Sequence, residues 1–160
     1  MTFSFFAFVL ACLPFALVCR YPSGGAGAAG RFRILVVDDD EVVRWSYHRS
    51  LQSVSRNVEA ASDGEEALQT MEQNPCDVVL LDLRMPGQDG LSVLRTIKQK
   101  WPESEVVIIT GYPTVDSAKE ALRLGAYDYV AKPVGPQDVI SVTDGAMAHK
   151  QWALRRVLEN

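Results

Sequence analysis

Residues 77–90 read DVVLLDLRMPGQDG, which is an apolar run that ends at Asp82 and continues into a loop containing Pro86 and Gly87. A short apolar run without polar alternation is typical of a strand that is buried on both faces, as in a parallel sheet. The carboxyl ends of strands are where an open parallel α/β sheet places its ligand site. An acidic side chain at that position is therefore the first candidate site residue.

Further hydrophobic runs end in the same way, and they are ILVVDDD (residues 34–40), VVIIT (106–110) and YVAKP (129–133). The residues at or just after their ends are Asp38 and Asp39, Thr110 and Lys132. If these strands are neighbours, three carboxylates, a hydroxyl and an ammonium group converge at one edge of the sheet. Such a set is suited to hold Mg²⁺ and to accept a phosphoryl group on an aspartate.

Short β-branched runs alternate with amphipathic stretches from residue 32 onward. We expect strands over residues 32–37, 57–61, 77–81, 105–109 and 126–131, and helices over about 40–53, 64–73, 90–100, 114–124 and from 136. Five such units predict an α/β fold with a doubly wound, five-stranded parallel sheet and helices on both faces. Right-handed crossovers leave few arrangements, and we expect the flavodoxin-like strand order 2-1-3-4-5.

Several polar residues have simpler explanations than a role in the site. Asp40 precedes a helical pattern and is expected to be an N-cap, whose side chain accepts hydrogen bonds from backbone amides. Asp63 lies in a capping-box pattern over residues 62–65 and is expected to be a cap or turn residue. His48 and His149 lie on expected helices without a partner nearby in sequence, so we expect both to be solvated. Cys76 precedes a buried strand and is expected to be a small buried thiol.

The first thirty residues differ from the rest, because residues 3–19 are almost wholly apolar and a Gly/Ala-rich stretch follows them. A helix over residues 3–19 would reach about 25 Å, which is short of the roughly 30 Å hydrocarbon core, and it would contain Pro14. Three interpretations stay open: a weak membrane anchor, a cleaved secretory signal, or a mis-assigned start codon that adds non-native residues. A secretory signal would normally have basic residues before the apolar run, and none is present. The signal ranks last, because it would export a domain whose phosphodonors are intracellular.

The composition excludes some classes of function. The formal net charge is -4 and charged residues make up 22% of the chain, without a dense basic stretch, so direct nucleic-acid binding is not expected. Three cysteines form neither an even disulfide framework nor a metal-binding spacing. We expect a cytoplasmic protein, tethered to the inner face of the membrane only if residues 3–19 are a real anchor.

Four motifs, VVDD, LLDLRMPGQDG, IITGYPT and YVAKP, resemble in order and spacing the receiver domain of two-component response regulators. The resemblance covers roughly residues 32–150, so we expect a receiver domain over 31–150 and a helical extension over 151–160. The extension is open to being a linker stub, a dimerising segment or a solvated helix end. The receivers of the nitrogen-regulation class are the most similar. There an ATPase and a DNA-binding domain follow, and the sequence printed here carries neither, so a transcriptional role is not expected.

The resemblance implies a role for each site residue. Asp82 would be the phosphoacceptor, Thr110 the switch hydroxyl, Lys132 the phosphate-binding cation and Tyr129 the switch aromatic residue. The implied ligands of Mg²⁺, with Mn²⁺ as an alternative ion, are Asp38, Asp39, Asp82 and the backbone carbonyl of Arg84. The resemblance also implies that Gly111 leaves room for the phosphodonor and that a cis bond precedes Pro133.

The implied function is a phosphorylated switch without a turnover substrate. A sensor histidine kinase or a phosphotransfer protein would be the donor. The face formed by the fourth helix, fifth strand and fifth helix would respond, by docking a downstream effector protein or by forming a phosphorylation-dependent homodimer.

Two other functions stay open. A haloacid-dehalogenase-like phosphatase also uses an aspartate nucleophile with Mg²⁺, and residues 38–40 supply its Asp-x-Asp spacing. Such an enzyme does not require Asp82 and normally needs a longer chain. The second alternative is an interaction module that keeps the fold and works without phosphate.

Overall fold

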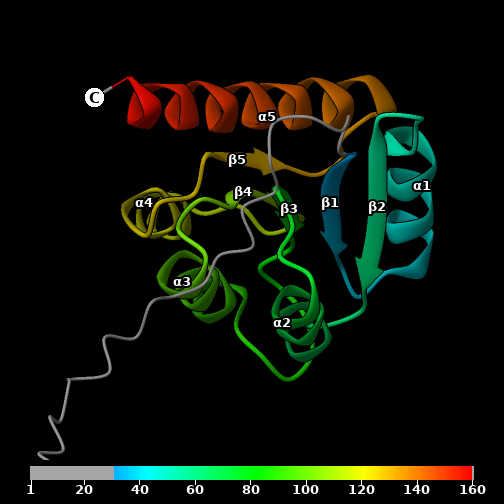
Figure 1. Cartoon of the computed structure of the whole chain (residues 1–160). Helices are drawn as coiled ribbons and strands as arrows, with labels where there is room; N and C mark the ends of the chain where they lie inside the picture. Colours follow the sequence, from blue (N-terminus) through cyan, green and yellow to red (C-terminus); the bar gives the residue numbers. More distant parts are fainter. Residues whose placement is uncertain (1–30, 160) are drawn as a thin grey trace, which may run out of the picture.

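Five parallel strands form one sheet in the order β2-β1-β3-β4-β5 (Figure 1), which confirms the predicted fold class. The strands are β1 (Phe32–Val37), β2 (Arg56–Ala61), β3 (Val78–Leu81), β4 (Glu105–Thr110) and β5 (Asp128–Ala131). This computed structural model describes residues 31–159. The apolar leader over residues 1–30, and with it the predicted anchor or signal, lies outside the described residues.

The five helices cover both faces of the sheet (Figure 1). They are α1 (Glu41–Leu51), α2 (Gly64–Gln73), α3 (Gly90–Lys100), α4 (Val115–Arg123) and α5 (Pro136–Leu158). Helices α1 and α5 pack on one face, and α2, α3 and α4 pack on the other. None of the helices between residues 31 and 159 is long and apolar enough to cross a membrane.

Two hydrophobic cores explain why the central strands are apolar on both faces. In β1, Leu35 and Val37 belong to the core beneath α2, α3 and α4. Ile34 and Val36 belong to the core beneath α1 and α5. All four side chains are at most 1% exposed, so over residues 34–37 neither face of β1 has room for a polar residue. The first acid after this run, Asp38, therefore lies at the edge of the sheet.

Local hydrogen bonds fix the start of three helices. The Asp40 carboxylate accepts from the amide of Val42 at 2.8 Å, and the Asp63 carboxylate accepts from the amide of Glu66 at 2.9 Å. Thr114 caps α4 in a reciprocal capping box. The predicted N-cap role of Asp40 is confirmed, and of the two roles expected for Asp63, cap or turn residue, the structure shows the cap. Because Asp40 is used by α1, Asp38 and Asp39 are the acids after β1 that remain for the site.

Candidate functional site

The sequence-predicted site residues meet at the carboxyl edge of the sheet. In the parallel register, Val37 pairs with Leu81, Leu81 with Ile108, and Thr110 with Ala131. The residues that end or follow these strands are therefore neighbours: Asp38 and Asp39 after β1, Asp82 after β3, Thr110 at the end of β4, and Lys132 after β5.

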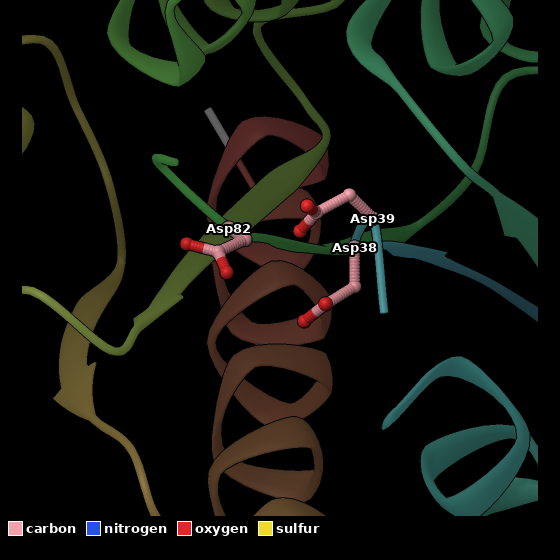
Figure 2. A group of neighbouring side chains, drawn as sticks. All are labelled: Asp38, Asp39 and Asp82. Carbon is pink, nitrogen blue, oxygen red and sulfur yellow. The ribbon is translucent and has the colours of Figure 1, made fainter. Parts of the chain in front are cut away.

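Three carboxylates lie together at this edge (Figure 2). Asp38, Asp39 and Asp82 each offer an oxygen, and these oxygens lie within 4.8 Å of one another. Asp38 and Asp82 are only 2% and 5% exposed, whereas Asp39 is exposed. The cluster thus has two buried acids at its base and one at its open side.

Lys132 bridges the two buried acids. Its Nζ donates to Asp38 Oδ2 at 2.6 Å and to Asp82 Oδ2 at 2.7 Å. Burial lowers the pKa of Lys132, but the hydrogen bonds to the two carboxylates outweigh burial, and the net shift is upward. Burial raises the pKa of Asp38, and its hydrogen bond to Lys132 only partly offsets that shift. Lys132 therefore stays charged, while Asp38 is held in a place that disfavours its charged form.

Backbone amides hold the other oxygen of each buried acid. The amide of Asp40 donates to Asp38 Oδ1 and the amide of Arg84 donates to Asp82 Oδ1, both at 3.0 Å. A guanidinium nitrogen of Arg44 also donates to the Asp38 backbone carbonyl at 2.6 Å. Both carboxylates are thus oriented from two sides, by the backbone and by Lys132.

The charge and the donor atoms of the cluster fit a divalent cation. Three carboxylates share one ammonium group, so the cluster carries a net charge of −2 when all three acids are ionised. Mg²⁺ prefers oxygen ligands and is commonly held by one or two protein carboxylates together with phosphate and water. A dication at this place relieves the mutual repulsion of the acids. The residues present therefore fit the implied metal.

Thr110 and its surroundings form the second side of the site. Thr110 is fully buried, and its Oγ1 accepts a hydrogen bond from the amide of Tyr112 at 3.3 Å. Gly111 is exposed, and a Cβ built there would meet nothing nearer than Lys132 Cδ at 4.0 Å. The peptide bond between Lys132 and Pro133 is cis, as the resemblance implied.

Tyr129 is half-buried and contacts α4. Its hydroxyl shares a hydrogen bond of 2.7 Å with Ser117 Oγ, and Ser117 is also the capping partner of Thr114. Tyr129 thus links β5 to the first turn of α4. Sequence reasoning missed Ser117, because its contact with Tyr129 depends on how α4 packs beside β5.

The solvated role expected for His149 is only partly right. Its side chain is about half exposed, but its Nδ1 lies 2.8 Å from Glu105 Oε1 at the start of β4. The next residue, Lys150, donates to Asp77 Oδ1 at 2.7 Å just before β3. These two contacts lie at the amino edge of the sheet, at the opposite end of the strands from the carboxylate cluster.

Comparison with known proteins decides the family. The family model described as "Response regulator receiver domain" matches residues 34–144. The chain belongs to the response regulator receiver family. The matched region spans the carboxylate cluster, Thr110 and Lys132 together.

The similar curated proteins are much longer than this receiver chain. "DNA-binding transcriptional regulator NtrC" of Klebsiella pneumoniae is 37% identical over 116 residues, which cover 72% of this chain and 25% of that protein. A "putative response regulator NtrX-like" protein of Rickettsia felis is 36% identical over 102 residues, or 62% of this chain and 22% of that protein. The chain thus spans about a quarter of the length of these relatives.

Solved receiver structures share the fold. A CheY-like receiver domain protein from Methanospirillum hungatei JF-1 is 27% identical with a TM-score of 0.75, over 78% of this chain and 99% of that one. NtrX from Brucella abortus, solved in complex with ADP, is 32% identical with a TM-score of 0.72, over 81% of this chain and 29% of that one. The chain is therefore an NtrC/NtrX-like receiver domain, a member of a family of regulatory switches.

Proposed function

We propose that this receiver accepts a phosphoryl group on Asp82, in the presence of Mg²⁺, from a sensor histidine kinase or a phosphotransfer protein. The single observation that carries the proposal is the Lys132 ammonium group bridging Asp38 and Asp82 beside Thr110, at the carboxyl edge of a receiver fold. The direct contact of Lys132 with Asp82, and the place of Thr110 at the end of the neighbouring strand β4, support Asp82 as the nucleophile, Lys132 as the cation and Thr110 as the hydroxyl donor. We take residues 31–150 as the functional unit and 151–160 as an extension of its last helix.

In the proposed reaction a phosphoryl group moves from a nitrogen of the donor to an oxygen of Asp82. A carboxylate oxygen of Asp82 attacks phosphorus, an O–P bond forms, and the P–N bond of the donor phosphohistidine breaks to leave an acyl phosphate on the aspartate. Such transfers depend mainly on positioning and on stabilising charge at the moving oxygens. The amide of Arg84 already orients Asp82, and Lys132 would exchange one carboxylate oxygen for a phosphoryl oxygen.

Mg²⁺, or Mn²⁺ in its place, would be held by Asp39 and Asp82 directly, by Asp38 through water and by the backbone carbonyl of Arg84. When bound, the ion neutralises negative charge on the transferred phosphoryl group. The chain's own contribution is to hold the carboxylates together and to keep the Lys132 ammonium group in contact with Asp82.

The phosphoryl group would act as a switch by drawing Thr110 toward it. The Thr110 hydroxyl would donate to a phosphoryl oxygen, and Tyr129 would leave Ser117 and turn inward. The face formed by α4, β5 and α5 would then change and dock an effector protein or a second copy. The phosphoryl group shifts the equilibrium between the two states of the protein only if it interacts more favourably with one of them. We place this activity in the cytoplasm, with a membrane tether only if residues 3–19 anchor the chain.

Intact-protein mass spectrometry tests the proposal. The chain is incubated with acetyl phosphate with and without Mg²⁺, beside Asp82→Asn and a matched control, Asp63→Asn, which keeps a capping residue at α2. One Mg²⁺-dependent phosphoryl group is expected, base-labile and acid-stable, absent from Asp82→Asn and present in the control. Steady turnover of a small phosphomonoester would instead favour the phosphatase alternative. A chain that acquires no phosphate and turns over no substrate would favour the phosphate-independent module.

A further inference from the structure

Helix α5 is held to the sheet by buried side chains over its first half only. These side chains recur at helical spacing and are each at most 8% exposed: Val139, Thr143, Ala146 and Met147. Between residues 148 and 157, none of the side chains that the structure describes is buried. The helix nevertheless continues to Leu158 (Figure 1). Over residues 148–157 its attachment therefore depends on polar and ring contacts rather than on a core.

Two consecutive side chains make these contacts at the amino edge of the sheet. His149 Nδ1 lies 2.8 Å from Glu105 Oε1 at the start of β4, and Lys150 Nζ donates to Asp77 Oδ1 at 2.7 Å just before β3. The ring of Tyr127 lies beside the imidazole, with the two ring centroids 5.4 Å apart. The second half of α5 is thus joined to two strands through one histidine and one lysine.

The acid that faces His149 is buried. Glu105 is 8% exposed, and the hydrogen bond to its carboxylate comes from His149. Lys98 Nζ lies 3.9 Å from the other carboxylate oxygen, but it donates to the backbone carbonyls of Pro102 and Ser104. A buried carboxylate is costly without a paired charge. The charge on His149 therefore matters for the stability of this contact.

The hollow beside His149 is short of one positive charge when the imidazole is neutral. The charged groups that line it are Glu103, Glu105, Lys98 and Lys150. Asp77 adds a third acid through its bond to Lys150, and Tyr127, which also lines the hollow, carries a phenol, which is uncharged at neutral pH. Three acids therefore face two lysines, and protonation of His149 supplies the missing charge.

Protonation also improves the hydrogen bond itself. A neutral imidazole donates to Glu105 only from the tautomer that carries its single proton on Nδ1, whereas an imidazolium carries a proton on both nitrogens. Hydrogen bonds between charged groups are stronger than those between neutral ones. The positive ring also lies close enough to the Tyr127 ring for a cation–π contact. Histidine changes its charge near neutral pH, so the contact responds to pH in that range.

We propose that His149 is a proton-responsive attachment point of α5, which holds the helix after Met147 more tightly when the imidazole is protonated. The inference goes beyond the proposed function and does not depend on phosphorylation of Asp82. An ammonium–carboxylate pair such as Lys150–Asp77 keeps its charges near neutral pH, so it is the part of the attachment that does not respond. Because α5 belongs to the face formed with α4 and β5, pH would change the end of that face that lies nearest the C-terminus.

Hydrogen–deuterium exchange of the full chain at about pH 6 and about pH 8 tests the proposal. Protection factors of the amides of residues 148–158 are compared after correction for the intrinsic pH dependence of exchange. The amides of residues 139–147 are the internal reference. We expect protection of residues 148–158 to be about three- to tenfold higher at the lower pH, the difference between a neutral and a charge-assisted hydrogen bond. The reference segment should not change.

Four variants separate His149 from other sources of pH dependence. His149→Gln keeps a neutral donor and Glu105→Gln removes the charged partner, so both should lose the pH dependence. His48→Gln changes the other of the two histidines in the sequence and should retain the dependence in full. Lys150→Met should lower protection by the same factor at both pH values, because its ion pair does not titrate in this range.

Three results would overturn the proposal: a pH dependence that persists in His149→Gln, equal protection of residues 148–158 at both pH values, or protection that rises with pH. If Glu105→Gln does not fold, the reference amides lose their protection, and His149→Gln, at a side chain that is 49% exposed, decides alone. The chain is measured without phosphodonor or Mg²⁺. The result is therefore independent of whether Asp82 accepts a phosphoryl group.

Discussion

Lys132 is the residue on which the electrostatics of the site depend. Its ammonium group contacts two carboxylates that are almost fully buried. Removing one partner of a buried ion pair leaves an unpaired buried charge, which lowers stability more than replacing both partners by hydrophobic residues. The site is therefore a place where a single substitution changes both stability and chemistry.

Lys132→Met should lower the free energy of unfolding in metal-free buffer by roughly 3 kcal/mol. Saturating Mg²⁺ should restore much of the loss, because a dication supplies positive charge to the same acids. Urea denaturation with and without Mg²⁺ measures both effects. Lys100→Met is the matched control, since its ion pair with Glu72 is exposed on both sides and should contribute less than about 1 kcal/mol. Equal losses in the two variants would contradict this account.

The Cys76 thiol is a probe of burial away from the site. It is 1% exposed, and burial raises its pKa from 9.0 to about 11. Because the folded pKa lies above the unfolded one, folding favours the protonated thiol. That contribution is complete below about pH 9 and is lost as the pH rises through about 11.

The unfolding free energy should therefore fall more steeply between pH 9 and 11 in the natural chain than in Cys76→Ala. The difference is at most roughly 2–3 kcal/mol, from about 1.4 kcal/mol for each pKa unit. Denaturation curves at a series of pH values for both proteins test it, and their difference cancels other groups that titrate in this range. Parallel pH profiles would show that Cys76 titrates as a solvated thiol.

At the scale of single residues, the sequence predicted those positions that follow from strand ends. Asp38, Asp82 and Lys132 could be placed together, because parallel strands present their carboxyl ends at one edge. The contacts between Tyr129 and Ser117, and between His149 and Glu105, could not. They join residues 12 and 44 positions apart on different elements, and they depend on packing distances that no local pattern encodes.

At the scale of elements, helix starts were more predictable than strand starts. A cap is a local device, so Asp40 and Asp63 could be identified from their neighbours. The fifth strand was expected from Ala126 but begins at Asp128. Gly125 adopts a φ of +94° to end the turn after α4, and the amide of Ala126 still donates to Ala121 in that turn. Ala126 is therefore still part of the turn that ends α4, and the strand begins two residues later.

Helix α3 is packed unusually tightly against the site through its first residue. A Cβ on Gly90 would lie 2.6 Å from the Asp82 backbone oxygen and from Leu83 Cα. Both are backbone atoms that cannot turn away. The first residue of α3 therefore packs directly against the backbone of Asp82 and Leu83, and this contact positions the loop between Asp82 and α3.

Gly90→Ala should therefore destabilise the fold by roughly 1–3 kcal/mol, the usual cost of overpacking, and should disturb the Asp82 loop. Gly111→Ala is the control, because its added Cβ would meet nothing closer than 4.0 Å, and its stability should change by less than about 1 kcal/mol. Thermal unfolding ranks the two, and amide NMR shifts near Asp82 report the loop. The opposite ranking would show that the loop adapts freely.

At the scale of the whole molecule, the candidate site and the contacts that anchor α5 lie at opposite edges of the sheet. The carboxyl edge holds the acids and Lys132, whereas the amino edge anchors α5 through Lys150 and His149. The proposed switch connects the carboxyl edge to the face of α4, β5 and α5 through Thr110 and Tyr129. The parallel sheet could be predicted from the alternation of elements, and its strand order from the flavodoxin-like arrangement. The state of that face depends on contacts that only the folded chain shows.

Phosphorylation should shift the chain from monomer toward dimer if this face is the output, and Thr110 should be required for the shift. Thr110→Ala is expected to accept the phosphoryl group on Asp82 yet remain monomeric, because it lacks the hydroxyl that would donate a hydrogen bond to the phosphoryl group. Thr110→Ser keeps the hydroxyl and should dimerise. Sedimentation velocity with acetyl phosphate and Mg²⁺ measures the states, and mass spectrometry of the same samples confirms phosphorylation. If a phosphorylated Thr110→Ala chain dimerises as strongly as the Ser variant, Thr110 does not couple phosphorylation of Asp82 to the face of α4, β5 and α5. The phosphoryl group would then change that face through other residues.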